Sequence, residues 1–458
     1  MRITIPFLLI FVTALSAVTE PIINSEKADG YKGIWFTLGQ FLEHGDKYSG
    51  GLGTYTAKHV PLAVYAPEVN KTFFVYGGTR KGDERYLLCM ASFYDHATGS
   101  VPKPTIVHDK EGVNDPHDNP SISLTKDGHV WVFVSGRGRK RPGFIYRSTE
   151  PYSVDAFERV RECEMTYPQP WHIKDKGFLL CFTKYTNGRE LYWTTSNDGH
   201  TWAEDQKLAG MGGHYQTSRE KDGRIITAFN YHPGGNVDKR TNLYYAETSD
   251  LGATWKNAAG ETLTTPLEAT QNPALVRDYA AEGRLVYIKD INFDAEERPV
   301  ILIITSGGYA PGPESDPRIW TIVHWNGTAW EFHEVAQSDH NYDMGSLYIE
   351  ADGTWRIIGP TEPGPQPMGT GGEMALWTSC NNGVTWTKAK NITTNSTYNH
   401  AYARRPVNAH PDFYAFWADG NPDEFSPSHL YFTNRECDAV WMLPYDMTGD
   451  TMTPERIQ

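Results

Sequence analysis

The chain has 458 residues, of which 13% are aromatic, and it contains 42 glycines and 29 prolines. Its formal net charge of -14 argues against nucleic acid as a partner, because a phosphate backbone requires a basic protein surface. Aromatic residues and turn formers are abundant, whereas long segments rich in alanine, leucine, glutamate and lysine do not occur. This composition predicts an all-β protein.

The first segment, residues 1–17, reads MRITIPFLLIFVTALSA. One early positive charge, an apolar centre and a small-residue end predict a secretory signal peptide. The apolar run is too short for a comfortable membrane span. We therefore expect an exported protein, periplasmic or extracellular, in which residues 18–458 form a single domain with no membrane span.

Three later segments share one turn pattern: TSNDGHTW (195–202), TSDLGATW (248–255) and SCNNGVTW (379–386). All fit the Asp-box, in which an aspartate or asparagine caps a tight turn, a glycine takes an unusual conformation and a tryptophan packs below. Three copies predict the repeated hairpins of a β-propeller. Their role is structural.

Polar clusters that run into apolar strands form a second repeat, and we interpret each as the start of an innermost strand. The seven starts lie at His59, His117, Gln169, His214, Asn272, His340 and His400. Seven starts predict seven blades around a central channel. Ring closure requires the chain ends to meet, so we expect residues 30–38 to complete the last blade beside residues 438–445.

Histidines and tyrosines at these starts are candidates for chemistry on one face. A polysaccharide lyase needs a base, a cation for the uronate carboxylate and a proton donor for the leaving oxygen. The candidate lyase residues are His117, His214, Tyr215, Arg219 and Tyr231. The alternative is a polar ring that satisfies strand ends around ordered water or a cation.

Charged residues near the channel suggest two further sites. Asp339, His340 and Asp343 are candidate ligands for a structural calcium ion in the central channel, and no other cofactor is expected. Lys58, Arg404 and Arg405 are candidates for binding a substrate carboxylate. The basic run at residues 137–141 is expected to be a solvated loop.

Several longer motifs carry a family resemblance. GYKGIWFTLGQ, NDPHDN, YPQPW, DHNYD, PTEPGPQ and NHAYARRPV resemble the seven-bladed propellers of glycoside hydrolase family 145, and the similarity spans residues 30–446. The resemblance implies an α-L-rhamnosidase that removes rhamnose α-1,4-linked to glucuronic acid in acidic polysaccharides such as arabinogalactan side chains. His59, in TYTAKH, matches the catalytic histidine. It also implies that His59 lies on the propeller face opposite His117 and Tyr215.

A more distant resemblance links the chain to the propeller ulvan lyases of polysaccharide lyase families 24 and 25. In that alternative, His117 and Tyr215 match the base and acid positions, and Lys184 stands where a neutralising arginine is expected. A third alternative is a glycan-binding propeller without catalysis. In each case the expected partner is an acidic, rhamnose-containing polysaccharide or oligosaccharide, and we expect a monomer.

Overall fold

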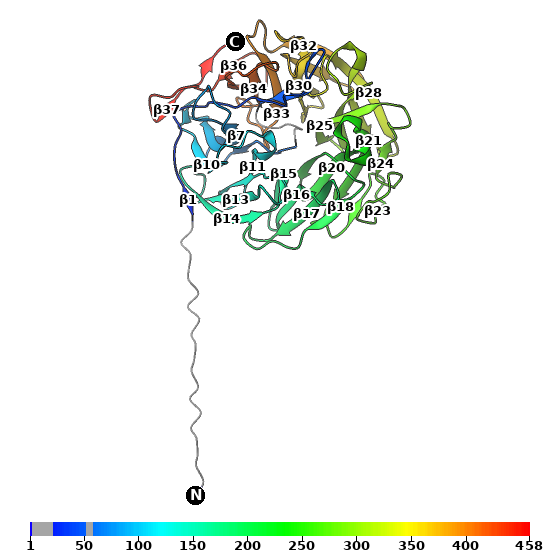
Figure 1. Cartoon of the computed structure of the whole chain (residues 1–458), viewed down its shortest axis with the longest axis horizontal. Coiled ribbons are helices and arrows are strands. Elements are labelled where there is room, and N and C mark those ends of the chain that lie inside the picture. Colours follow the sequence, from blue (N-terminus) through cyan, green and yellow to red (C-terminus); the bar gives the residue numbers. More distant parts are fainter. Residues whose placement is uncertain (2–21, 52–57) are drawn as a thin grey trace.

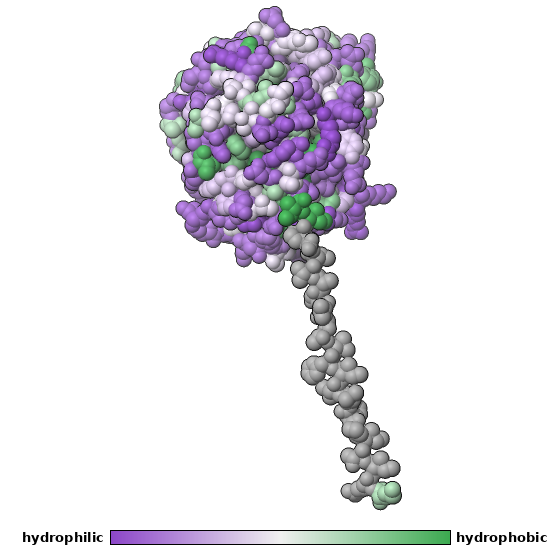
Figure 2. Space-filling view, turned by 90° about the vertical axis from the view of Figure 1, so that its left-hand side faces the viewer, coloured by the Kyte–Doolittle hydropathy of each residue, from purple (hydrophilic) through white to green (hydrophobic). Residues whose placement is uncertain are grey.

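The computed structural model describes Met1, residues 22–51 and residues 58–458. Seven sheets of four or more strands surround a central axis, which confirms the all-β, seven-bladed propeller (Figure 1). Apart from Met1, the predicted signal peptide lies outside the described residues. Within the described part of the chain, no helix is long and apolar enough to cross a membrane. Figure 2 shows a mainly hydrophilic side of the surface with small apolar patches.

Each blade is built mainly from consecutive antiparallel strands. Blade 1 contains β6 (Ala63–Ala66), β7 (Lys71–Gly78), β8 (Leu88–Asp95) and β10 (Thr105–Asp109). Blade 2 contains β11 (Pro120–Leu124), β12 (Val130–Val134), β13 (Gly143–Ser148), β14 (Phe157–Cys163) and the edge strand β1 (Ile23–Asn24). Blade 3 contains β15 (Thr166–Ile173), β16 (Gly177–Tyr185), β17 (Arg189–Ser196) and β18 (Gln206–Ala209).

The next two blades follow the same order. Blade 4 contains β19 (Gln216–Lys221), β20 (Arg224–Tyr231), β21 (Thr241–Thr248), β22 (Trp255–Lys256), β23 (Thr262–Leu263) and β24 (Leu275–Arg277), which pairs with β21. Blade 5 contains β25 (Leu285–Phe293), β26 (Pro299–Ser306), β27 (Arg318–Trp325) and β28 (Trp330–Ser338).

The last two blades complete the ring. Blade 6 contains β29 (Ser346–Ile349), β30 (Trp355–Glu362), β31 (Glu373–Ser379) and β32 (Thr387–Asn391). Blade 7 contains β33 (Asn399–Arg404), β34 (Ala415–Gly420), β35 (Leu430–Thr433), β36 (Val440–Met442) and β38 (Glu455–Arg456).

Short elements lie outside the blades. The paired strands are β2 (Phe36–Thr37) with β5 (Ser49–Gly50), β3 (Phe41–Leu42) with β4 (Gly45–Asp46), and β9 (Val101–Pro102) with β37 (Thr451–Met452). The 3₁₀ helices are η1 (Pro116–Asp118), η2 (Pro233–Gly235), η3 (Val237–Lys239) and η4 (Pro313–Ser315).

The hydrophobic core lies between neighbouring blades. One cluster joins side chains of blades 1, 2 and 7, and another joins blades 3 and 4. Central strands such as β7 and β26 are buried on both faces, so their sequences are almost continuously apolar. This packing fixes each inner strand, and therefore the polar residues at its start, relative to the axis.

One of the seven predicted strand starts is wrong. Asn272 precedes β24, which pairs with β21 at the edge of blade 4, and the inner strand of blade 5 is β25. The segment after Asn272 has a short apolar pattern like that of an inner strand. However, β24 is only half-buried, whereas β25 is mostly buried, as an inner strand requires. The other six starts precede or enter inner strands.

The chain ends meet, but not as a fourth strand of blade 7. Gly33 bridges both Ser428 of the last blade and Gly78 of the first, and the Tyr31 amide donates to the Pro444 carbonyl. The C-terminal strand β37 pairs with β9, next to blade 1. The ring is therefore closed by terminal segments that join blades 7 and 1, while β36 and β38 complete blade 7 themselves.

The Asp-boxes form the predicted turns, at β17–β18, β21–β22 and β31–β32. In the second box, the Asp250 carboxylate accepts hydrogen bonds from the Thr254 amide and hydroxyl. Gly252 has φ +84°, and a Cβ atom added there would lie 2.3 Å from Nε1 of the buried Trp193 in blade 3. The box glycine thus allows two blades to approach closely.

This close approach gives a stability prediction. We expect Gly252→Ala to lower the free energy of unfolding by about 2–4 kcal/mol, because it adds a clash with Trp193 to the cost of a left-handed alanine. Gly260 is the matched control, since it has the same φ of +84° and nothing within 4 Å of an added Cβ. Gly260→Ala should cost only about 1–2 kcal/mol. Urea unfolding measures both values, and an equal loss of unfolding free energy in the two variants would contradict the clash with Trp193.

Candidate active site

Antiparallel blades sort the loops onto two faces. The start of each inner strand lies on the same face as the loop between the second and third strands of its blade. We call this the strand-start face. The Asp-box turns join third and fourth strands, so they lie on the opposite face, which we call the Asp-box face.

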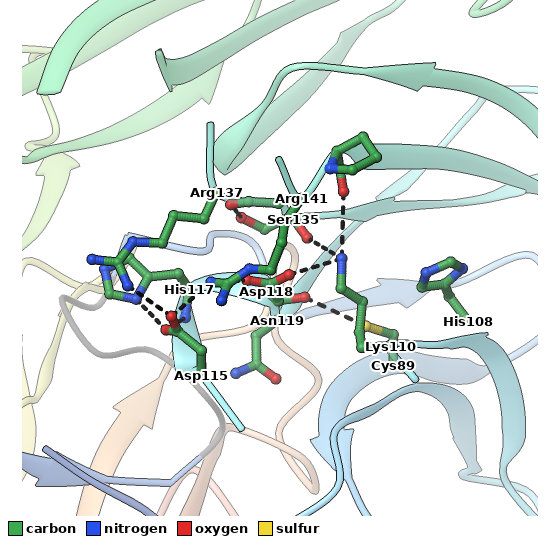
Figure 3. Close-up of polar contacts among 12 residues, drawn as sticks. Cys89, His108, Lys110, Asp115, His117, Asp118, Asn119, Ser135, Arg137 and Arg141 are labelled. Carbon is green, nitrogen blue, oxygen red and sulfur yellow. Dashed lines mark hydrogen bonds and ion pairs between the residues drawn. The ribbon is translucent and has the colours of Figure 1, made fainter. Parts of the chain in front are cut away.

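His117 and Asp115 form the centre of a polar cluster on the strand-start face (Figure 3). Asp115 caps η1: its Oδ1 accepts from the His117 amide at 3.0 Å and is also in short contact with His117 Nδ1. Asp115 Oδ2 accepts from Arg137 at 2.8 Å and from Arg141 at 2.6 Å. One carboxylate therefore binds an imidazole and two guanidinium groups.

A second carboxylate extends this network into the protein. Asp118 Oδ1 accepts from Arg141 at 2.8 Å, and its Oδ2 lies 2.9 Å from Lys110 Nζ (Figure 3). Lys110 also donates to the Ser135 carbonyl at 3.1 Å. Because Asp118 and Lys110 are both buried, this ion pair is weakly screened and holds Arg141 in place.

Protonation follows from these contacts. Burial alone would raise the pKa of Asp115, but the contacts with His117 and Arg141 outweigh it and lower that pKa. Burial lowers the pKa of His117 despite the opposing effect of Asp115. At neutral pH the imidazole is therefore neutral, with its proton on Nδ1 facing the carboxylate. Nε2 becomes the basic atom of the ring.

Aromatic side chains extend from His117 across blades 2 to 4. The Tyr167 ring lies 5.3 Å from the His117 ring and 5.8 Å from the Tyr215 ring, measured between centroids. Tyr167 has φ +54° and sits at an irregularity of β15. A bulky residue in this region is strained, and such strain is concentrated at functional sites.

Arg189 supplies a guanidinium group beside these phenols. Its Cζ lies 5.9 Å from the Tyr215 ring centre and 6.0 Å from that of Tyr185, and it donates to the Gly235 carbonyl at 3.2 Å. Burial alone would lower the pKa of Arg189, but the neighbouring tyrosines outweigh it and raise that pKa. Arg189 and Tyr185 are half-buried and Arg137 is exposed, so they form the outer edge of the site.

The structure brings together only part of the predicted lyase set. His117 and Tyr215 are connected through Tyr167, as described above. His214 is buried, and both ring nitrogens bond to backbone, at Asn230 O and the Met211 amide. Arg219 lies at the far end of the channel, and Tyr231 packs against the core of blades 3 and 4. These three residues lie outside the cluster around His117.

His59 does not lie on the face opposite His117. Its Nε2 is 3.1 Å from the His117 carbonyl oxygen, and its ring centre is 5.3 Å from that of Tyr167. The ring is 0% exposed, and burial lowers its pKa to about 3. The preceding motif residues 52–57 lie outside the described part of the chain. His59, which the resemblance matches to the catalytic histidine, is a buried neighbour of the His117 cluster.

The basic candidates lie in the channel rather than in that cluster. Lys58 is buried there, where its Nζ donates to the Ile288 carbonyl at 3.2 Å. Arg404 and Arg405 line a small cavity of about 20 Å³ with Arg219, below the His117 cluster and toward the Asp-box face.

The candidate calcium ligands do not converge. His340 accepts from the Tyr342 amide and contacts Thr370, while Asp343 accepts from the Gly371 and His340 amides. Asp339 accepts from the Met368 amide. Within the described residues, the one group of three metal-type ligand atoms that lie close together is His96, His410 and Asp412, elsewhere in the fold.

Sequence reasoning missed several residues of the cluster. The run at 137–141 was expected to be solvated, yet Arg137 and Arg141 bind Asp115; only Arg139 and Lys140 fit that expectation. Lys184 does not face the site, because it pairs with Asp205 at 3.0 Å. The guanidinium group that lies beside Tyr185 and Tyr215 is that of Arg189. The available signal was its position at the start of a third strand, on the same face as His117.

Comparisons with known proteins agree with this architecture. The chain is similar to an ulvan lyase of polysaccharide lyase family PL25, with a TM-score of 0.71, 16% identity, and coverage of 91% of this chain and 96% of that chain. It is also similar to a PL25 ulvan lyase bound to -[GlcA(1-4)Rha3S]-, with a TM-score of 0.70, 16% identity, and coverage of 91% of this chain and 96% of that chain. The similarity to the polysaccharide lyase Uly1 has a TM-score of 0.62 and 13% identity, and it covers 90% of this chain and 100% of that chain. At these identities, the likeness concerns the fold.

Sequence comparison identifies the family. Comparison with curated proteins gives no significant match. A protein-family model described as a BNR repeat-containing family member matches residues 90–338, which is more than half of the chain. The matched residues include the first two Asp-boxes and the His117 cluster. The chain therefore belongs to the BNR repeat-containing family.

Proposed function

We propose that the protein is a polysaccharide lyase that cleaves uronic acid linkages at the His117 cluster. The observation that carries the proposal is the contact of His117 Nδ1 with the arginine-held carboxylate of Asp115, which makes Nε2 a base at neutral pH. The similarity to ulvan lyase structures supports a rhamnose- and uronate-containing polysaccharide as substrate. Such a polymeric substrate also fits the export predicted from residues 1–17.

The cluster offers the three groups that β-elimination needs. His117 Nε2 takes the proton from C5 of the uronic acid, and the C5–H electrons form the C4–C5 double bond as the C4–O bond breaks. Arg189 and Arg137 pair with the uronate carboxylate, which lowers the cost of negative charge at C5. A phenol protonates the leaving oxygen, so no water is consumed.

We assign the proton donor to Tyr167 rather than to Tyr215. The Tyr167 ring contacts the His117 ring, whereas among the described residues the Tyr215 ring contacts Tyr167 and not His117. Proton removal and proton delivery occur at adjacent atoms, C5 and the oxygen on C4, so the two groups must lie side by side. Tyr215 then positions Tyr167 and faces Arg189.

Mutation of the base tests the proposal. We expect the protein to release unsaturated uronate from ulvan, measured by its ultraviolet absorbance, and His117→Gln to reduce this rate by roughly a hundredfold or more. His200→Gln is the control, because His200 is exposed in an Asp-box on the other face. Full activity of His117→Gln with unchanged folding would rule out this base.

The pH profile tests the protonation state. Because the active base is neutral and the pKa of His117 lies below 6.5, kcat/KM should rise with pH, reach half its maximum below pH 6.5 and be flat at neutral pH. Asp115→Asn should lower kcat by roughly a hundredfold or more, because an amide no longer fixes the Nδ1 proton.

Asp118→Asn is the matched control, since Asp118 shares Arg141 but does not bind His117. It should affect stability more than rate. If the two variants lose activity equally, Asp115 has no special role toward His117.

The α-L-rhamnosidase remains a second candidate, favoured by the grouping of Arg219, Arg404 and Arg405 around one small cavity. Three guanidinium groups suit the carboxylate of a glucuronic acid. His59 lies one residue before the Val60–Leu62 segment that also lines this cavity. Because its pKa is about 3, the His59 imidazole is neutral at neutral pH. In this candidate, His59 therefore acts as a base, or it acts by positioning a neighbouring group.

Free rhamnose distinguishes this candidate from the lyase. A rhamnosidase releases rhamnose from a rhamnose–glucuronate glycan, loses that activity in His59→Gln and keeps it in His117→Gln. If no free rhamnose forms while unsaturated uronate does, the second candidate is excluded.

A further inference from the structure

Two histidines and an aspartate lie together where the first and last blades meet. His96 follows β8, the third strand of blade 1, while His410 and Asp412 lie between β33 and β34, the first two strands of blade 7. Both connections are on the Asp-box face. One ligand atom from each of the three side chains lies within 4.8 Å of the other two. The closure of the ring therefore brings together metal-type ligands from its two ends.

Main-chain hydrogen bonds hold these two segments in place. The Val407 amide donates to the Ala63 carbonyl at 2.9 Å, and the Tyr65 amide donates to the Val407 carbonyl at 2.9 Å, which joins the blade 7 segment to β6. The His96 amide donates to the Asn70 carbonyl at 3.1 Å. The candidate ligands thus lie on backbone that the fold itself positions, as a specific metal site requires.

One ring nitrogen of His96 is not used by the fold. Its Nε2 lies 2.8 Å from the Thr72 hydroxyl, whereas its Nδ1 is buried and has no hydrogen-bond partner among the described residues. When the ring proton is on Nε2 and is donated to Thr72, Nδ1 carries a free lone pair. Metal-binding histidines typically have this arrangement, in which the nitrogen that does not bind the metal donates to a neighbouring oxygen.

His410 stacks on His96 and shares a turn with Asp412. The ring centres of the two histidines are 3.7 Å apart. His410 Nδ1 accepts from the Asp412 amide at 3.1 Å and lies 3.8 Å from Asp412 Oδ2. The turn is anchored by the buried Phe413, whose amide donates to the His410 carbonyl at 3.0 Å. Two imidazoles and one carboxylate therefore meet at the edge of the surface, within reach of water.

We propose that His96, His410 and Asp412 bind a zinc ion. Imidazole and carboxylate groups are both zinc ligands, whereas calcium and magnesium prefer oxygen ligands alone. A tetrahedral zinc ion holds its ligand atoms about 3.3 Å apart. Because Asp412 is exposed and His410 is only half-buried, small side-chain rotations bring the three ligand atoms to that spacing. Water provides the fourth ligand.

The ion fastens the ring at its point of closure. It joins a turn of blade 1 to a turn of blade 7 on the Asp-box face, whereas the His117 cluster lies on the strand-start face. It also differs from the calcium ion expected in the channel, because two of its three protein ligands are imidazoles. Zinc that binds the closed ring more tightly than the unfolded chain stabilises the fold.

Zinc binding to the folded protein tests the proposal. The full-length protein, made without a histidine tag and treated with a chelator, should bind zinc in isothermal titration calorimetry, and excess calcium should not displace it. Above the dissociation constant, each tenfold rise in free zinc should raise the folding equilibrium constant in urea by up to about tenfold. A crystal soaked in zinc should show an anomalous peak about 2.0–2.2 Å from one atom of each ligand.

Single variants locate the site. His410→Gln and Asp412→Asn should each weaken zinc binding by about a hundredfold or more, because each removes a direct ligand. His200→Gln is the matched control. His200 is also a histidine on the Asp-box face, two residues from the aspartate Asp198, but it lies outside the three-residue group. This variant should bind zinc as the wild type does.

Three results would overturn the proposal. One is a wild-type protein whose stability does not depend on zinc, another is a zinc-soaked crystal without a peak between His96 and His410, and the third is unchanged affinity in His410→Gln. A peak beside His117 instead would show that zinc binds the other face. If His410→Gln fails to fold, the exposed Asp412→Asn variant and the wild-type anomalous map decide.

Discussion

The carboxylate of Asp115 is the constraint on which the candidate site depends. It caps η1, fixes the tautomer of His117 and holds Arg137 and Arg141 through charge-assisted hydrogen bonds. The sequence Asp-Pro-His-Asp suits this geometry, because proline favours the first helical position and aspartate the cap. If this carboxylate were lost, a buried histidine and two arginines would lose their common partner.

Charge is handled differently at two depths of the same molecule. At the strand-start face, Asp115 and Asp118 alternate with Arg141 and Lys110, so each buried charge has an opposite partner. In the channel, burial lowers the pKa of Lys58 and of Lys289, and the side-chain nitrogen of each lies within hydrogen-bond distance of a backbone carbonyl oxygen.

Local patterns predicted the fold well and the site in part. The Asp-boxes and six strand starts could be predicted because turn residues and apolar strand patterns are local features that span only a few residues of the sequence. The error at Asn272 arose because an edge strand carries a similar apolar pattern. His117 and Tyr215 could be found because inner-strand starts converge. The start of a third strand could place Arg189 on the same face, but its approach to Tyr215 could not be predicted, since it depends on how blades 3 and 4 pack.

The direct test of the central claim is cleavage of ulvan in water enriched in oxygen-18. β-Elimination at the His117 cluster consumes no water, so the account predicts unsaturated products without heavy oxygen. Hydrolysis would transfer oxygen-18 to the newly formed reducing end. Saturated products carrying the heavy isotope would contradict the lyase assignment, whichever residue proved essential.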